Sequence, residues 1–195
     1  MKDEGTIRDY FNEFVYGSIF QDLDSCIKAQ ANFLVALGLM SYTEYLGGLL
    51  TGNLGIKNQV EVNFNKALEY FEHAGDGSYY LNFHVLDKNT SSNLNIYEIF
   101  RNGLVHEYFP KGKELIIVYN EPRLPLPAAD QGVGWINQDG QRILRFHCNA
   151  YFRDLKQAFD KYFQELIVKK DSVLLANFYK SINNLEKYDL QEITS

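Results

Sequence analysis

The stretch "RNGLVHEYFP", residues 101–110, concentrates residue types that can act on a phosphate group. Arg101 offers a planar fork of donors that suits phosphate oxygens, and His106 can accept and donate a proton near neutral pH. On a helix that turns about 100° per residue, Asn102 and His106 share one face, and Arg101 lies about 140° around the axis from His106. Tyr108 falls near Arg101. Together these groups could cleave a phosphodiester without a metal ion.

A structural role for the same residues is the main alternative. Arg101 could pair with Glu98 three residues earlier, and His106 could act as a favourable positive charge near the end of its helix. Gly103 leaves a gap in the helix surface where a backbone or a phosphate could approach closely. We expect the helix to stop at Pro110, because proline lacks the amide donor and restricts the residue before it.

The residues R-N-G-L-V-H-E-Y resemble the R-x4-6-H motif of the HEPN superfamily (higher eukaryotes and prokaryotes nucleotide-binding). In that family a polar residue typically follows the arginine, as Asn102 does, and Tyr108 fits the longer form R-x4-H-x-Y. The resemblance implies a helical bundle that works as a homodimer, with two motif helices facing each other across a cleft. It also implies a metal-independent endoribonuclease that needs no cofactor.

The same resemblance assigns roles to the motif residues. His106 would be the acid/base, Arg101 would hold the scissile phosphate, and Asn102 would orient the histidine. RNA would be the substrate, and the product would carry a 2′,3′-cyclic phosphate. In toxin–antitoxin members a nucleotidyltransferase antitoxin modifies the motif tyrosine, here Tyr108. Two other hypotheses stay open: a non-catalytic HEPN-type module that binds a nucleotide, RNA or a protein, and a structural helical dimer.

Arg142 and His147 repeat the R-x4-H spacing. Here Ile143 rather than a polar residue follows the arginine, no tyrosine follows the histidine, and the alternating pattern favours a strand. We therefore rank this pair second. With Trp135 and Arg145, the same residues could form an aromatic and basic ledge for single-stranded RNA. An amphipathic hairpin packed on the bundle is the simpler interpretation.

Glu44 is the one charged residue in the most apolar stretch of the chain, residues 33–50. A buried charge needs a partner, so Glu44 either pairs with a buried cation or accepts from a backbone donor. The sharper hypothesis is that Glu44 faces Arg101 or His106 and tunes the site. Because the stretch also contains the Gly47–Gly48 pair, it favours a core helix over a membrane span, and we expect no membrane partner.

The remaining histidines do not indicate a metal site. His73, His84 and His147 show no metal-ligand spacing with one another or with Cys26 and Cys148, so we expect no intrinsic metal ion. Two cysteines without a C-x-x-C spacing favour a reduced, cytosolic protein.

The net charge of −6 is distributed unevenly. Residues 1–100 hold 6 Lys/Arg against 13 Asp/Glu, residues 101–161 hold 9 against 7, and residues 162–195 hold 4 against 5. The motif therefore opens the only net-basic segment. An acidic chain disfavours indiscriminate nucleic-acid binding, but it leaves room for a local phosphate site.

Hydrophobic periodicity predicts the elements that position these residues. We expect helices at about 6–29, 30–50, 59–73, 95–109, 149–169 and 172–188, a short helix at 79–86 and a polar loop at 89–93. Gly52 should end the second helix. A strand is predicted at 114–120, and a hairpin pairs 134–136 with 142–147. The result is one mainly α, HEPN-like domain over residues 1–195, with five to six helices and a small antiparallel β insertion at about 114–147.

Overall fold

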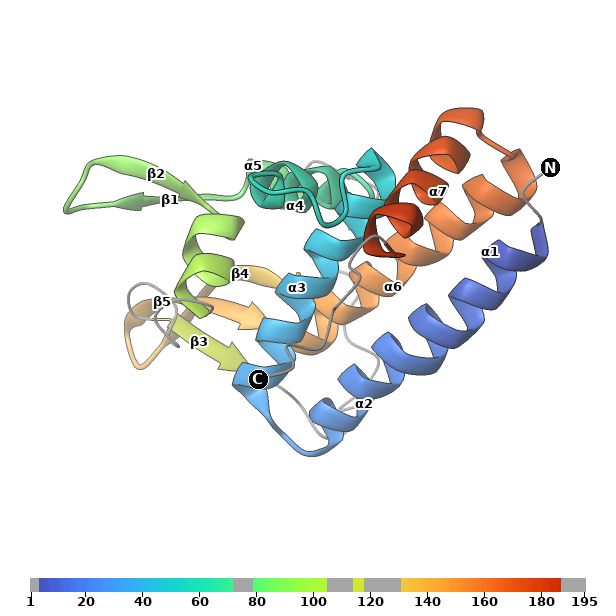
Figure 1. The fold of residues 1–195 in the computed structure, drawn as a ribbon. Helices are drawn as coiled ribbons and strands as arrows, with labels where there is room; N and C mark the ends of the chain where they lie inside the picture. The colour runs from blue at the N-terminus through green and yellow to red at the C-terminus, as the bar shows by residue number, and fades with distance from the viewer. Residues whose placement is uncertain (1–3, 72–78, 105–113, 118–130, 187–195) are drawn as a thin grey trace, which may run out of the picture.

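The computed structural model describes residues 4–71, 79–104, 114–117 and 131–186 of the chain. In these residues helices pack around α3, and the strands lie on one side of the bundle, with one hairpin extending away from it (Figure 1). The helical segments are α1 (Glu4–Tyr10), η1 (Phe11–Ile19), α2 (Phe20–Lys28), α3 (Asn32–Thr51), α4 (Val60–Leu68), α5 (Tyr79–Asn82), η2 (Tyr97–Arg101), α6 (Cys148–Gln164), η4 (Glu165–Lys169) and α7 (Ser172–Glu186). The strands are β1 (His84–Asp87), β2 (Ser92–Asn95), β3 (Glu114–Ile117), β4 (Val133–Gln138) and β5 (Gln141–His147).

The helix count agrees with the prediction for the longer elements. When adjoining α and π segments are taken as one helix, the described part of the chain has six longer helices and the one-turn α5. The mainly helical class is therefore confirmed.

The first helix runs without a break through α1, η1 and α2, close to the predicted 6–29. The buried apolar residues of α1 and η1 are Ile7, Phe11, Val15 and Ile19, spaced four residues apart. Such a repeat drifts around a regular α-helix, which has 3.6 residues per turn. The wider π-helical turns of η1 keep the repeat on one face, where it packs against the bundle.

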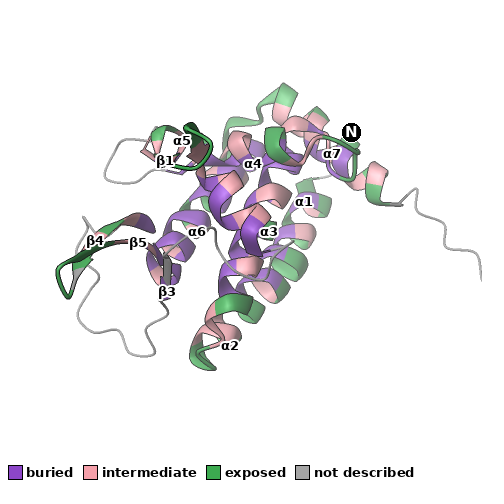
Figure 2. Ribbon diagram, turned by 90° about the vertical axis from the view of Figure 1, so that its left-hand side faces the viewer, coloured by how far each residue is buried: buried purple, intermediate pink, exposed green. Residues whose placement is uncertain are grey.

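The central helix α3 is the predicted second helix, and it ends as predicted. Gly52 follows Thr51 in the left-handed conformation, with φ of 72°. By length and composition alone α3 could cross a membrane, but 56% of its most apolar window is buried inside the fold. Figure 2 shows this burial along α3 and the helices around it. The structure therefore uses α3 as a core helix.

Two helices from the C-terminal part of the chain bind α3 through side chains. From α6, the Tyr151 hydroxyl lies 3.0 Å from Thr43 Oγ1, and the Tyr162 hydroxyl donates to the Leu49 carbonyl at 3.2 Å. From α7, two polar side chains donate to carbonyls near the end of α3, Asn177 to Leu50 and Ser181 to Gly48. The bonds to Leu49 and Leu50 satisfy carbonyls in the last turn of the helix, whereas the Gly48 carbonyl also accepts from the Gly52 and Asn53 amides.

Helix α4 packs against α3 at backbone distance. A Cβ atom added at Gly47 would lie 1.6 Å from the Asn63 carbonyl oxygen, so only glycine allows this approach. Asn63 itself is buried, and its side-chain oxygen accepts from Thr51 at 2.8 Å. The predicted third helix, 59–73, is shorter than expected, since α4 ends at Leu68. Its predicted end at Gly75 lies outside the described residues.

The predicted hairpin is present, and its turn explains its register. β4 and β5 pair antiparallel, from Val133↔Phe146 to Gln138↔Gln141. Asp139 and Gly140 both have positive φ, which suits a two-residue turn between twisted strands. The third strand departs from the prediction, because β3 pairs parallel to β5 rather than antiparallel. The sequence pattern predicted a strand there, but it does not determine the direction of that strand in the sheet.

A second hairpin, β1–β2, replaces the second half of the predicted short helix at 79–86, and the predicted loop at 89–93 contains its turn at 89–91 and the start of β2. Only Tyr79–Asn82 is helical. Asp87 then stabilises a turn, accepting from the Asn89 amide at 2.9 Å and from the Thr90 hydroxyl at 2.8 Å. This local alternative to a helix is typical of aspartate, and it sends the chain back as β2.

Candidate functional site

The helix that carries the motif begins with a reciprocal cap. The Asn95 amide donates to the Glu98 carboxylate, and the Glu98 amide donates to the Asn95 side chain, each at 2.9 Å. The helix is described from Ile96 to Leu104. Its buried face packs on the sheet, where the Phe100 and Phe146 rings lie 4.9 Å apart. Packing of this face fixes the direction of the neighbouring Arg101.

Arg101 is held by groups from two elements. Its Nη2 donates to Glu44 Oε2 on α3 at 3.1 Å, and its guanidinium lies 5.6 Å from the centre of the Tyr97 ring. The side chains of Arg101 and Glu44 are 17% and 25% exposed. Arg101 Nε is buried and makes no hydrogen bond in the described part of the chain. The guanidinium is therefore oriented, but its donors are not all used.

Glu98 does not take the structural role that the sequence predicts. Among the described residues it forms no ion pair with Arg101, because its carboxylate caps the helix through Asn95. Glu44, more than fifty positions earlier in the chain, is the partner instead. The contact expected in the sharper hypothesis for Glu44 is thus present, whereas its effect on a reaction stays a prediction.

Tyr97 was not singled out by the sequence. Its position four residues before Arg101 is the usual spacing for side-chain contact on a helix, and this signal could have identified it. The ring also packs 5.5 Å from Phe64, which continues the contact into the core. Burial raises the pKa of the Tyr97 hydroxyl, and the positive charge of Arg101 opposes that rise.

The motif helix is wider than an α-helix. The Asn102 amide donates to the Tyr97 carbonyl, a bond that spans five residues. The angles expected at about 100° per residue therefore do not apply here, and π-helical turns recur at functional sites. Gly103 is buried, so the gap expected at its position faces the interior rather than a ligand.

His106, Tyr108 and Pro110 lie outside the described residues. The approach of His106 to Arg101, the cleft between two motif helices and the end of the helix at Pro110 stay predictions. Asn102 is described and half-buried, one residue after Arg101.

The second R-x4-H pair does not converge. His147 is fully buried, and its Nδ1 accepts from the Ala150 amide at 3.0 Å, so it caps α6. Arg142 lies at the other end of β5, where its guanidinium stacks 4.7 Å from the centre of the Trp135 ring. Arg145 occupies the opposite face of the strand from Arg142. Of the four residues in the predicted ledge, the sheet brings only Trp135 and Arg142 together.

Behind the sheet lies a buried polar cluster that is fully engaged within the protein. The Tyr80 hydroxyl donates to Asp154 and accepts from the Gly132 amide, and Arg153 holds the other Asp154 oxygen at 2.8 Å. Burial and the nearby Asp154 charge raise the pKa of Tyr80. These bonds join α5, α6 and the start of β4, which is a structural role.

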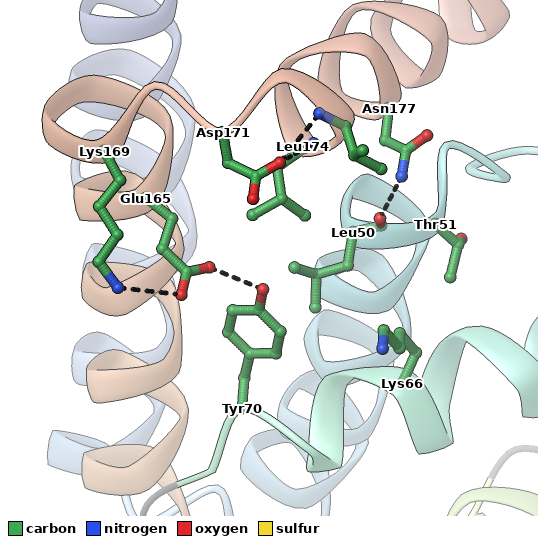
Figure 3. A pocket seen from close by; sticks show the side chains of 10 residues that line it. Leu50, Thr51, Lys66, Tyr70, Glu165, Lys169, Asp171, Leu174 and Asn177 are labelled. Carbon is green, nitrogen blue, oxygen red and sulfur yellow. Dashed lines mark hydrogen bonds and ion pairs between the residues drawn. The ribbon is translucent and has the colours of Figure 1, made fainter.

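A cavity of about 590 Å³ lies at the C-terminal end of α3, between α4, η4 and α7 (Figure 3). Tyr70 points across it and donates to Glu165 at 2.7 Å, and Lys169 reaches the same carboxylate at 3.5 Å. Asn177 donates to the Leu50 carbonyl, while Asp171 caps α7. Since these polar groups bond to one another, the cavity works as a joint between helices and does not select a ligand class.

No group of three or more metal-ligating side chains occurs among the residues with described positions. Both cysteines are free thiols, and burial raises the pKa of Cys148.

A comparison of the chain with protein-family models, with curated proteins and with solved structures finds no match. The assignment of function therefore depends on the residues and their geometry.

Proposed function

We propose that the chain is a HEPN-like, metal-independent endoribonuclease that works as a homodimer. The observation that carries the proposal is the position of the Arg101 guanidinium: Glu44 accepts from Nη2, the Tyr97 ring lies beside the guanidinium, and 17% of the side chain stays exposed. A guanidinium has five N–H groups, and bidentate recognition of phosphate needs two of them. A fixed, partly exposed guanidinium avoids much of the entropy loss on binding.

In the proposed reaction His106 accepts the proton of a ribose 2′-hydroxyl, and the 2′-oxygen attacks the adjacent phosphorus. The bond to the 5′-oxygen breaks, and that oxygen leaves with a proton. Arg101 stabilises the negative charge that grows on the phosphoryl oxygens. Asn102 orients His106, and Glu44 keeps the guanidinium in position. The product is a 2′,3′-cyclic phosphate.

The test is cleavage of single-stranded RNA in the presence of EDTA by the wild-type protein, Arg101→Ala and His106→Ala. Loss of an acid/base or of a phosphate clamp should each lower the rate by roughly 100-fold or more. Arg8→Ala is the matched control, because it removes an exposed arginine whose ion-pair partner, Glu4, lies on the same helix and outside the site. Wild-type rates in Arg101→Ala or His106→Ala, with the fold intact by circular dichroism, would refute the proposal.

A non-catalytic HEPN-type binding module is the second candidate, and the Arg101–Glu44 ion pair favours it. The carboxylate already neutralises the guanidinium within the subunit. In that case Glu44→Gln should tighten binding of RNA or a nucleotide, because the anion no longer competes with Glu44, and no substrate should turn over. In a nuclease that needs Glu44 for orientation, the same substitution should slow cleavage.

The resemblance also names a protein partner, a nucleotidyltransferase that modifies Tyr108. Incubation with such an enzyme and ATP should add a nucleotidyl group to the wild-type chain and not to Tyr108→Phe, as read by intact-protein mass spectrometry. Modification of both proteins would place the target on another residue.

A further inference from the structure

We propose that Trp135 and Arg142 form a stacking platform for single-stranded RNA at the outer end of the β4–β5 hairpin. This inference deepens the proposed function and rests on it, since the platform would hold the same substrate beside the motif helix. The two residues are called the hairpin platform below.

The first observation is the exposure of the ring. Trp135 is the only tryptophan of the chain, and 40% of it is exposed although the Arg142 guanidinium lies 4.7 Å from its centre. A stacked arginine orients an indole and adds positive charge at its edge. Every nucleobase has a π face, so such a pair accepts bases with little regard to sequence.

The second observation is the register of the strands. Side chains on one face of a hairpin recur every two residues, so Trp135 and Arg142 share a face with Val133, Leu144 and Phe146. Those last three residues are buried against the bundle. The platform is thus the outer part of a face whose inner part is core. Figure 2 shows the change from buried to exposed residues along β4 and β5.

The third observation is that the inner part of this face contacts the motif helix. Its inner residue Phe146 contacts Phe100, which directly precedes Arg101. Trp135 pairs with Leu144, two residues farther along β5, or about 7 Å. The motif helix therefore packs on the buried inner part of the same sheet that carries the platform at its outer end.

Charge supports RNA as the occupant. The hairpin carries Arg142 and Arg145 against Asp139, in the only net-basic segment of an acidic chain. A purely apolar protein partner would gain nothing from an arginine stacked on the ring, whereas a polyanion with exposed bases uses both groups.

The single tryptophan makes the test direct, because its fluorescence reports on the platform alone. The full chain with His106→Ala, which should not cleave, is titrated with a short single-stranded RNA and with an RNA duplex of the same sequence. We expect the single strand to quench Trp135 and the duplex to leave it nearly unchanged, since paired bases cannot stack on the ring. Absence of quenching at RNA concentrations that saturate binding would overturn the proposal.

Variants separate stacking from charge, with affinity read from the anisotropy of a labelled RNA. Trp135→Ala should weaken single-strand binding by on the order of ten-fold, and Trp135→Phe by less. Arg142→Ala should also lower the slope of log affinity against log salt by about one, because one phosphate contact is lost. Equal affinity in Trp135→Ala and the His106→Ala parent would overturn the platform.

The platform and the nuclease can fail separately. If the wild-type chain cleaves RNA and Trp135→Ala cleaves it with the same KM, the platform is wrong and the proposed function stands. If the wild-type chain does not cleave RNA but single strands quench Trp135, the nuclease is wrong and the platform stands on binding alone.

Discussion

Two arginine–histidine pairs with the same spacing occur in this chain, and their arginines lie in different secondary structure. Arg101 lies on a helix that Glu44 and the sheet hold in place. Arg142 and His147 lie on β5, where five residues extend about 16 Å and an odd number of steps reverses the face. Arg142 lies next to the exposed turn of the hairpin, whereas His147 lies in the core, where it caps α6.

The comparison teaches that spacing along the chain indicates chemistry only together with the local conformation. On a helix, a few residues bring two side chains within one turn, whereas in a strand the same count separates them. The two residues of the strand pair have separate roles. His147 caps α6, and Arg142 stacks on the exposed Trp135 ring. Four measurements test this difference between residues in the core and residues at the surface.

The largest effect on stability should come from alkaline pH, which acts on buried tyrosines in the core. Burial raises the pKa of Tyr80 on α5 and of Tyr151 on α6. The unfolded chain loses these protons from about pH 10, while the folded chain keeps them, so their contribution to stability is constant below about pH 10 and is lost above it. Above that pH, each of the two tyrosines lowers the free energy of unfolding by about 1.4 kcal/mol per pH unit.

Tyrosinate absorbance and circular dichroism, followed together against pH, check this prediction. We expect part of the absorbance to appear only when the helical signal is lost. A complete tyrosine titration with the helical signal intact would contradict it.

The second effect is the loss of the α6 cap in His147→Ala. The Ala150 amide loses its acceptor and a buried ring is removed, so unfolding free energy should fall by about 1–3 kcal/mol. His84→Ala is the control, because His84 lies on exposed β1 and should change stability by less than about 0.5 kcal/mol. Urea denaturation gives both values. Equal stability of the two variants would remove the structural role of His147.

The third effect is smaller and concerns Glu44→Gln. Because both partners of the ion pair are partly exposed, stability should fall by less than about 1 kcal/mol. RNA cleavage should fall by more than this stability change explains, since Arg101 loses its fixed orientation. The double variant Glu44→Gln with Arg101→Ala should be no slower than Arg101→Ala alone. A variant with neither effect would show that Glu44 does not tune the site.

The smallest effect on stability should be that of Arg142→Ala. The stack on Trp135 is exposed, so unfolding free energy should change by no more than about 0.5 kcal/mol. The same variant should weaken single-strand RNA binding. A large loss of stability, measured by urea denaturation, would mean that the arginine holds the hairpin together rather than a ligand.

Local patterns in the sequence predicted the elements well where one physical signal dominated. Gly52 indicated the end of α3, and the residues around Gly140 indicated the β4–β5 turn. The prediction was wrong at 84–87 and at 92–93, where strands form on either side of the Asp87 turn. It was also wrong for β3, because the direction of a strand depends on the sheet that it joins.

At the candidate site, the sequence identified Arg101 and proposed Glu44 near it, yet favoured Glu98 as the ion-pair partner in the structural alternative. A partner three residues away is visible in a helical pattern, whereas one on another helix depends on how α3 packs. The π-helical widening around Tyr97 and the burial of Gly103 also follow from packing, and the hydrophobic periodicity of the sequence does not predict them.

The position of α3 has a consequence for synthesis on the ribosome. The helix packs against α6 and α7, whose hydrogen-bonding residues follow their partners on α3 by 108 to 133 positions. The nascent chain therefore carries a helix as apolar as a membrane span long before its covering helices emerge. We expect α3 to be the segment that chaperones bind during translation, and the arrival of α7 to release it.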